Sequence, residues 1–353
     1  MKNNKLFSKL ILNWYKKNKR DLPWRNTKDP YKIWVSEIIL QQTQISQGTK
    51  YYFNFIEKFP DLKTLSKSTE SDVLKIWEGL GYYSRAINML NNAKLLKKHN
   101  RDFPNNYNEL IELKGIGDYT AAAISSICKD EKKAVLDGNV FRVISRVFNI
   151  SAPINKPSGK KIFQEIIYKL LPTKKIGDYN QGLMDFGSIH CTIKSPKCND
   201  CPVNIVCKSY KLKNIESRPV KIKTQAVKKI RNLNYFIIEF KKNIYIQKRL
   251  ENDIWKNLYE LPLLESKKKI TKQIIEKFLS SNFRITEIVD CVFLKKINHK
   301  LSHQNLNIFF WKISTKKIKL QNEGKLLKTR LKSVLNYPFP KPISKYLNEY
   351  LFT

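Results

Sequence analysis

The stretch Leu113-Lys114-Gly115-Ile116-Gly117-Asp118-Tyr119, which runs into Thr120-Ala121-Ala122-Ala123-Ile124, decides the fold. A helical pattern meets two glycines one residue apart and continues into an alanine-rich helix. Glycine lets the backbone turn tightly and approach a ligand, and the next helix start offers free N–H groups to an anion such as a DNA phosphate. A dinucleotide-binding loop is excluded, because no strand precedes the glycines and the third glycine is absent. A plain turn between helices remains the alternative.

Helical periodicity extends on both sides of this hairpin and covers the first 210 residues. Pro30 opens one of the helices, as proline does in a first turn. The expected helical stretches are Leu6–Tyr15, Ile33–Ile45, Asp72–Trp77, Ala86–Leu96, Tyr119–Cys128, Val140–Phe148 and Ile162–Leu171.

The pattern changes after Tyr210. Residues 211–231 are charged and lack a period, which predicts a linker. From 232 to 353 the pattern predicts an α+β domain. Its expected elements are strands at Leu233–Phe240, Asn243–Lys248, Val289–Leu294 and Leu306–Ile313, and a helix at Ile270–Leu279.

Charge narrows the classes of partner. The 353 residues include 67 Lys and Arg against 30 Asp and Glu, a net charge of +37, which favours a polyanion such as nucleic acid. The lysine excess is spread along the whole chain, so the composition bias of an AT-rich genome is the alternative. No apolar run is long enough to span a membrane and the start is a poor signal peptide. We therefore expect a cytoplasmic chain.

Four of the six cysteines lie close together as Cys191, Cys198, Cys201 and Cys207. Clustered thiolates in a chain too large to need disulfides indicate metal ligation in a reducing compartment. Four thiolates in one loop can hold zinc or a [4Fe–4S] cluster, and the spacing is unlike that of a paired zinc ribbon.

Two carboxylates lie in contrasting settings. Glu37 lies among apolar residues on a predicted helix, where burial would raise its pKa and let it act as a general acid. Asp137 directly precedes the helix expected at Val140–Phe148, where a carboxylate caps the helix and stays ionised. Opposed environments let one site hold an acid and an anion together. The alternatives are a solvent-facing glutamate and an ordinary helix cap.

In this order, these segments resemble the adenine DNA glycosylases of the MutY type, in the helix-hairpin-helix superfamily that also contains endonuclease III. The match covers essentially the whole chain. Besides the hairpin and the four cysteines, the matching segments are Trp14-Tyr15, Leu22-Pro23-Trp24-Arg25, Pro30-Tyr31, Ser36-Glu37, Gln41-Gln42-Thr43-Gln44, Gly79-Leu80-Gly81-Tyr82-Tyr83, Asp137-Gly138-Asn139-Val140 and Asn180-Gln181.

The resemblance assigns roles by position. It implies that Glu37 protonates adenine N7, that Asp137 stabilises the positively charged sugar, and that Tyr119 assists at the same centre. The other residues that it places against adenine or DNA are Arg25, Gln41, Gln42, Tyr82, Gly115, Gly117 and Gln181. Among these, Gln42 and Tyr82 match residues that enter the base stack when adenine is flipped out.

The resemblance also implies that the four clustered cysteines ligate one [4Fe–4S] cluster. Endonuclease III is the nearest rival, but its lysine nucleophile is replaced here by Tyr119, so a monofunctional glycosylase is expected. Lys114 departs from the family, which usually has proline at that place. A DNA-binding protein with degraded catalysis is the alternative from another class.

The region after the linker resembles the family's Nudix-like domain, which senses 8-oxoguanine opposite the adenine. Leu301-Ser302-His303 lies where the family has Phe-Ser-His, so Ser302 and His303 are the expected lesion contacts, while the leucine departs from the pattern. No Nudix catalytic box with clustered glutamates is present. We thus expect an all-α helix-hairpin-helix glycosylase region with an iron–sulfur loop at 1–210 and an α+β Nudix-like domain at 232–353. The expected substrate is double-stranded DNA with A:8-oxoguanine or A:G mispairs, bound by a monomer in the bacterial cytoplasm, at the nucleoid.

Overall fold

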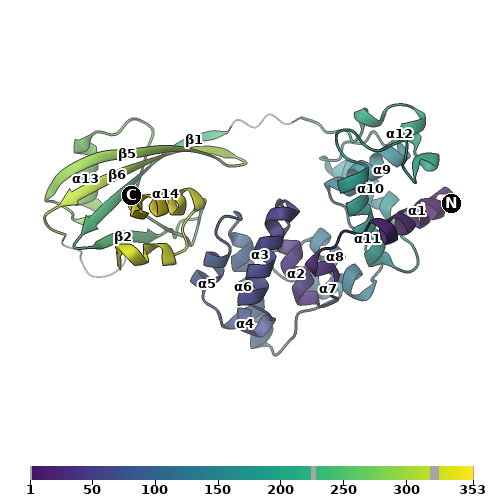
Figure 1. The fold of residues 1–353 in the computed structure, drawn as a ribbon, viewed down its shortest axis with the longest axis horizontal. Helices are drawn as coiled ribbons and strands as arrows, with labels where there is room; N and C mark the ends of the chain where they lie inside the picture. The colour runs from purple at the N-terminus through teal and green to yellow at the C-terminus, as the bar shows by residue number, and fades with distance from the viewer. Residues whose placement is uncertain (1, 224–227, 319–325, 353) are drawn as a thin grey trace. The chain divides into compact units, whose positions relative to one another are not determined.

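The computed structural model describes residues 2–223, 228–318 and 326–352 (Figure 1). The chain divides into two compact units. The first comprises Met1–Lys67 with Asn88–Thr224, and the second comprises Ser68–Ile87 with Gln225–Thr353.

The first unit is helical. Pro30 opens α2 behind Asp29, whose side chain accepts the Tyr31 N–H as an N-cap. Its α-helices are α1 (Lys2–Asn18), α2 (Pro30–Ile39), α3 (Ile45–Lys58), α4 (Leu62–Lys67), α7 (Tyr107–Ile111), α8 (Asp118–Lys129), α9 (Gly138–Phe148), α10 (Pro157–Leu170), α11 (Ile176–Asp185) and α12 (Lys208–Lys211). Short helical turns are η1 (Pro23–Arg25), η2 (Phe186–His190), η3 (Asn204–Val206) and η4 (Ile215–Ser217), and α6 (Ser84–Lys98) begins in the other unit.

The core of the first unit lies where α1, α9, α10 and α11 pack together. Apolar residues at helical spacing supply it, among them Phe7 and Ile11 of α1 and Val143 of α9, all fully buried. The Trp14 ring meets the Phe186 ring edge-on at 5.1 Å between centroids. This packing fixes the positions of two helices that carry predicted site residues. Asp137 directly precedes α9, and Gln181 is a buried residue of α11.

The predicted hairpin joins α7 to α8. Gly115 has φ +85°, a left-handed conformation, and a Cβ there would lie 2.8 Å from Asn88 Nδ2. Across the turn, the Tyr107 hydroxyl donates to Asp118 Oδ1 at 2.6 Å. α8 packs against α2, so the hairpin also positions Tyr119 beside Glu37.

The second unit contains a mixed sheet with the order β3-β2-β1-β6-β5, in which β4 also pairs with β1 and β7 with β2. β1 and β6 run parallel, whereas β5 and β6 form a long antiparallel hairpin. The strands are β1 (Lys229–Phe240), β2 (Asn243–Lys248), β3 (Tyr259–Glu260), β4 (Leu263–Ser266), β5 (Ile288–Lys300), β6 (Gln304–Thr315) and β7 (Leu327–Arg330).

Side-chain alternation gives the sheet two apolar faces. Phe236 and Ile238 pack in one cluster with Leu279 of α13 (Lys272–Phe283). Phe310 stacks on Tyr346 of α14 (Lys341–Phe352) at 3.8 Å between ring centroids. The turn η5 (Leu331–Asn336) and the helix α5 (Glu70–Ile76) belong to the same unit.

Three sequence-based expectations differ from the structure. The helix expected at Ile33–Ile45 is broken into α2 and α3, because Gln42 adopts a left-handed conformation with φ +57°. β1 begins at Lys229, inside the expected linker 211–231, because its first residues pair with β6. Residues 224–227 of that linker lie outside the described ranges. The strand expected at Val289–Leu294 continues to Lys300. No helix within the described ranges has the length and apolar character needed to cross a bilayer.

Candidate active site

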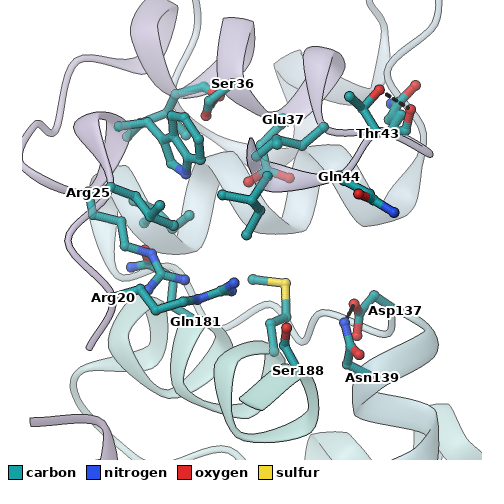
Figure 2. Close-up of a pocket in the computed structure, with 18 of the residues that line it drawn as sticks. Arg20, Arg25, Ser36, Glu37, Thr43, Gln44, Asp137, Asn139, Gln181 and Ser188 are labelled. Atoms are coloured by element: carbon teal, nitrogen blue, oxygen red, sulfur yellow. Dashed lines mark hydrogen bonds between the residues drawn. The ribbon is translucent and has the colours of Figure 1, made fainter. Parts of the chain in front are cut away.

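A cavity of about 730 Å³ opens in the first unit between α2, α8, the start of α9 and α11. Figure 2 shows Glu37 above it and Asp137 with Asn139 on its lower side. The cavity thus brings together residues that lie far apart in the sequence. The sequence-predicted residues that line it are Arg25, Glu37, Gln41, Gln42, Tyr119, Asp137 and Gln181.

Glu37 is a buried acid. Its helix α2 is buried on nearly every face, and only 9% of Glu37 is exposed. Burial raises the pKa of the Glu37 carboxyl to about 7, and the Asp137 charge adds to the rise, while a hydrogen bond from Tyr119 and the charge of Arg25 oppose it. At neutral pH the protonated form therefore remains populated and can give up a proton inside the cavity.

Asp137 caps α9, as its position before the helix predicts. Its Oδ1 accepts the Val140 N–H at 2.7 Å, and its Oδ2 accepts the Asn139 side-chain amide at 2.7 Å. Burial nevertheless raises the pKa of Asp137 above its ordinary value, although these hydrogen bonds and the charge of Arg142 oppose the rise. The expected contrast between a neutral and an ionised carboxyl is thus reduced, because both groups are desolvated. The hydrogen bonds remain on Asp137 and favour its ionised form.

Tyr119 lies between the acid and α11. Its hydroxyl donates to the Glu37 carboxylate, and burial together with the charges of Glu37 and Asp137 raises its pKa well above the ordinary value. The same hydroxyl lies 3.3 Å from Met184 Sδ. The tyrosine therefore stays protonated and acts as a hydrogen-bond donor.

A buried ion cluster forms one wall of the cavity, and sequence reasoning missed its centre. Arg25 Nη2 lies 2.7 Å from Asp185 Oδ1, Arg20 Nε lies 2.8 Å from the same oxygen, and the Asp185 side chain is fully buried. Burial alone would raise the pKa of Asp185, but the two guanidinium groups hold it below its ordinary value. The signal was available, because Asp185 lies four residues after Gln181 on one helix face.

The glutamines occupy different parts of the cavity. Gln181 is buried and donates weakly to Gly177 O at 3.4 Å, so its amide is available to a ligand. Gln41 Nε2 lies 3.4 Å from Thr120 Oγ1. Gln42 lines the rim, is exposed and has a left-handed backbone conformation.

Three predicted DNA contacts lie outside this cavity. Gly115 and Gly117 form the hairpin, and Gly117 is the N-cap position of α8. Tyr82 is 49% exposed with φ +46°, in a turn that is closed by the Trp77 Nε1 bond to Gly81 O at 3.1 Å. The Arg85 guanidinium carbon lies 5.6 Å from the centroid of the Tyr82 ring.

The four clustered cysteines line one small cavity together with Arg146. All are free thiols. Within the described residues, no group of three or more His, Cys, Asp or Glu side chains is arranged for a metal ion. The four thiols nevertheless line one small common space, and four thiolates are the donor set that a polynuclear iron–sulfur cluster uses.

Two arginines of α9 connect the cysteine loop to this helix, which begins directly after Asp137. Arg142 Nε donates to Cys191 O at 2.9 Å, and its Nη2 donates to Asn139 Oδ1 at 2.9 Å. Arg146 donates to Thr192 O at 2.7 Å and lies 3.4 Å from Cys191 Sγ. Asn139 in turn donates to Asp137, so one network runs from the loop to the carboxylate.

Ser302 and His303 lie in the turn between β5 and β6, where both are exposed. Ser302 Oγ and His303 Nδ1 are 3.2 Å apart, and the Leu301 N–H donates to Gln304 O at 2.8 Å to close the turn. Both side chains are therefore accessible to solvent at this turn.

Residues 35–169 match the HhH-GPD superfamily of base excision DNA repair proteins, and residues 234–349 match the NUDIX domain. The adenine DNA glycosylase of Buchnera aphidicola subsp. Schizaphis graminum (strain Sg) is 36% identical over 97% of this chain and 98% of its own length. The human adenine DNA glycosylase is 37% identical over 56% of this chain and 38% of its own length.

Among solved structures, a thermostable thymine-DNA glycosylase matches with a TM-score of 0.55 and 33% identity, over 60% of this chain and 98% of that one. An endonuclease III–DNA complex matches with a TM-score of 0.50 and 20% identity, over 58% of this chain and 94% of that one, which shows the fold. The whole-length sequence match and the two family domains lead to one conclusion. The chain belongs to the adenine DNA glycosylase family, enzymes that hydrolyse N-glycosyl bonds.

Proposed function

We propose that this chain is a monofunctional glycosylase that hydrolyses the N-glycosidic bond of adenine mispaired with 8-oxoguanine or guanine. The observation that carries the proposal is the buried Glu37, with a pKa of about 7, facing the same cavity as Asp137. One group can supply a proton and the other negative charge, as the cleavage of a glycosidic bond requires.

The reaction begins when adenine is flipped out of the duplex into the cavity. Glu37 donates its proton to adenine N7, which makes the neutral base a better leaving group. Gln181 can pair with the N6/N7 edge of the base, and Arg25 lines the same pocket, held by Asp185.

As the bond breaks, positive charge develops on the sugar. Asp137 stabilises this charge, and its two short hydrogen bonds from Val140 and Asn139 fix the carboxylate in place. Water then adds to the sugar carbon and loses a proton, which leaves an abasic site and free adenine.

The absence of an amine at the site supports the monofunctional mechanism. Tyr119 stands directly after the hairpin, and among the described residues that line the cavity none is a lysine. A Schiff base with the sugar therefore has no nucleophile there.

Recognition of the opposite base is assigned to the second unit. The exposed pair Ser302 and His303 offers hydrogen-bonding groups that a modified purine can meet. Helix α13 carries Glu276 as its only acidic residue, which agrees with recognition rather than nucleotide hydrolysis by this domain.

We assign one [4Fe–4S] cluster to Cys191, Cys198, Cys201 and Cys207. The fit rests on four thiols around one cavity, with the Arg146 guanidinium beside Cys191 to offset negative charge. Bound there, the cluster would cross-link the loop and hold its conformation for DNA contact. The proposed partner is duplex DNA bound by a monomer at the bacterial nucleoid.

The test is single-turnover adenine release from duplexes with adenine opposite 8-oxoguanine, guanine or thymine. We expect release only from the two mispairs, and strand cleavage only after alkali. Borohydride should trap no covalent complex. Binding without release would favour the degraded binding protein, and cleavage without alkali would favour endonuclease III chemistry.

A further inference from the structure

A second cavity, of about 650 Å³, lies entirely within the second unit, and neither the excision chemistry nor the turn at Ser302 uses it. It opens on the face of the sheet that α13 covers in part. Asn232 and Asn234 of β1 share this face with Phe236, which packs against α13. Both asparagines line the cavity, and Asn234 is buried there.

The polar groups of this cavity are held in fixed orientations. Asn307 Nδ2 donates to Asn232 Oδ1 at 2.8 Å, and Asn232 donates to Ser266 O at 3.1 Å. Asn234 Oδ1 accepts the Trp311 indole N–H at 3.3 Å, which fixes the plane of that ring. An amide has two N–H groups and one carbonyl, so Asn307 retains capacity for a ligand beyond the bond that it makes here.

Aromatic rings stand beside these amides. Trp311 meets Phe293 edge-on at 5.2 Å between centroids, and Phe293 is 47% exposed. Phe309 also lines the cavity. An amide ladder next to aromatic faces suits a planar heterocycle, since the rings stack on its face while the amides meet its edge.

The rim is basic. Lys268 and Lys269 follow β4, and Lys296 projects from β5 with its Nζ 5.5 Å from the Phe309 ring centroid. No acidic residue is among the described residues that line the cavity. Positive charge beside aromatic rings is the arrangement that holds a phosphate next to a stacked base.

We propose that this cavity binds the base and phosphate of one unpaired nucleotide, either free or in a single-stranded DNA segment. The heterocycle stacks among Trp311, Phe309 and Phe293, Asn307 meets its edge, and Lys268, Lys269 and Lys296 hold the phosphate. The volume fits one nucleotide. With Glu276 as the only acid on α13, the site binds without hydrolysing.

The test titrates the full chain with 2′-deoxyguanosine 5′-monophosphate by isothermal calorimetry, in the wild type and three variants. Lys296→Gln removes a rim charge, and Trp311→Leu removes a stacking ring. Lys295→Gln is the matched control, because Lys295 is the neighbouring residue on β5 but pairs with Glu349 of α14 at 2.5 Å. Adenine release is measured in parallel and should be unchanged, because none of these residues lines the excision cavity.

We expect saturable one-to-one binding that Trp311→Leu and Lys296→Gln each weaken by at least about five-fold, the lower range for loss of one stacking contact. Lys295→Gln should change affinity less than about two-fold. If Trp311→Leu fails to fold, Lys296→Gln and Lys268→Gln, both at exposed positions, carry the comparison. Lack of saturation, equal affinities in all variants, or equal competition by inorganic phosphate would overturn the proposal.

The source of the nucleotide is read from competition. If a four-nucleotide single strand occupies the site at a lower concentration than the monophosphate does, the ligand is unpaired DNA. If the monophosphate occupies the site at the lower concentration, the ligand is the free nucleotide. Because binding is measured without base excision, its failure is distinguishable from failure of the proposed glycosylase activity.

Discussion

Replacing Glu37 by glutamine should abolish adenine release and yet stabilise the protein at alkaline pH. The carboxyl has an ordinary pKa of 4.5, and burial raises it to about 7 in the folded chain. When folding raises the pKa of a group, the contribution of that group to stability is complete below its pKa in the unfolded chain. This contribution is lost as the pH rises through its pKa in the folded chain. The relevant window therefore runs from about pH 4.5 to about pH 7.

The magnitude follows from the size of the shift. A difference of about 2.5 pKa units at about 1.4 kcal/mol per unit gives about 3.5 kcal/mol of destabilisation by the ionised carboxylate above pH 7. Glutamine has a similar shape and no charge. The variant should therefore match the wild type near pH 4.5 and exceed its stability by about 3.5 kcal/mol at pH 8.5, an increase in Tm of roughly 7–14 °C.

The assay is thermal unfolding of both proteins across pH 4.5–8.5 at constant ionic strength. Glu57→Gln is the control, because Glu57 is an exposed residue of α3 and its replacement should shift stability by less than about 0.5 kcal/mol at every pH. A Glu37→Gln protein that is less stable than the wild type at pH 8.5, or whose advantage does not change with pH, would refute the reasoning.

Three further predictions rest on other contacts. Asp185→Asn should destabilise the first unit by about 3–5 kcal/mol in urea unfolding and slow adenine release, because the buried Arg25 guanidinium and the partly exposed Arg20 guanidinium lose their partner; unchanged stability would contradict the ion cluster. Arg142→Met should lower both iron content and Tm, because the bonds to Cys191 O and Asn139 are lost, whereas an iron content equal to the wild type would count against the network. Ser302→Ala should slow single-turnover release opposite 8-oxoguanine by about five-fold, the effect of one hydrogen bond, and leave release opposite guanine within two-fold. Equal effects on the two substrates would remove Ser302 from lesion recognition.

Much of the fold was predictable because long periodic segments dominate it. The helices α1, α8 and α10 and the strands β1 and β2 lie where hydrophobic periodicity placed them. The break at Gln42 was not predictable from periodicity, because a single left-handed residue leaves the apolar spacing on both sides intact. Strands as short as β3, with two residues, carry no period, and α14 at the end of the chain was not identified.

The candidate site was predictable only in part. The resemblance indicated Glu37, Asp137 and Tyr119, and the structure brings all three to one cavity. Sequence could not show that burial also raises the pKa of Asp137, because desolvation depends on what packs over a residue. The spacing of Asp185 from Gln181 was visible in the sequence, but its partners Arg20 and Arg25 lie about 160 residues away in the chain and could not be identified from that spacing.

The central claim is that Glu37 acts as the general acid in adenine excision, and the pH dependence of single-turnover adenine release tests it most directly. With adenine opposite 8-oxoguanine, the rate should fall about ten-fold per pH unit above about pH 7, as the Glu37 carboxyl ionises, and should also fall in acid, as the Asp137 carboxylate becomes protonated. Glu37→Gln should show no measurable release at any pH. A wild-type rate that stays level up to pH 9, or a Glu37→Gln variant that releases adenine at the wild-type rate, would contradict the account.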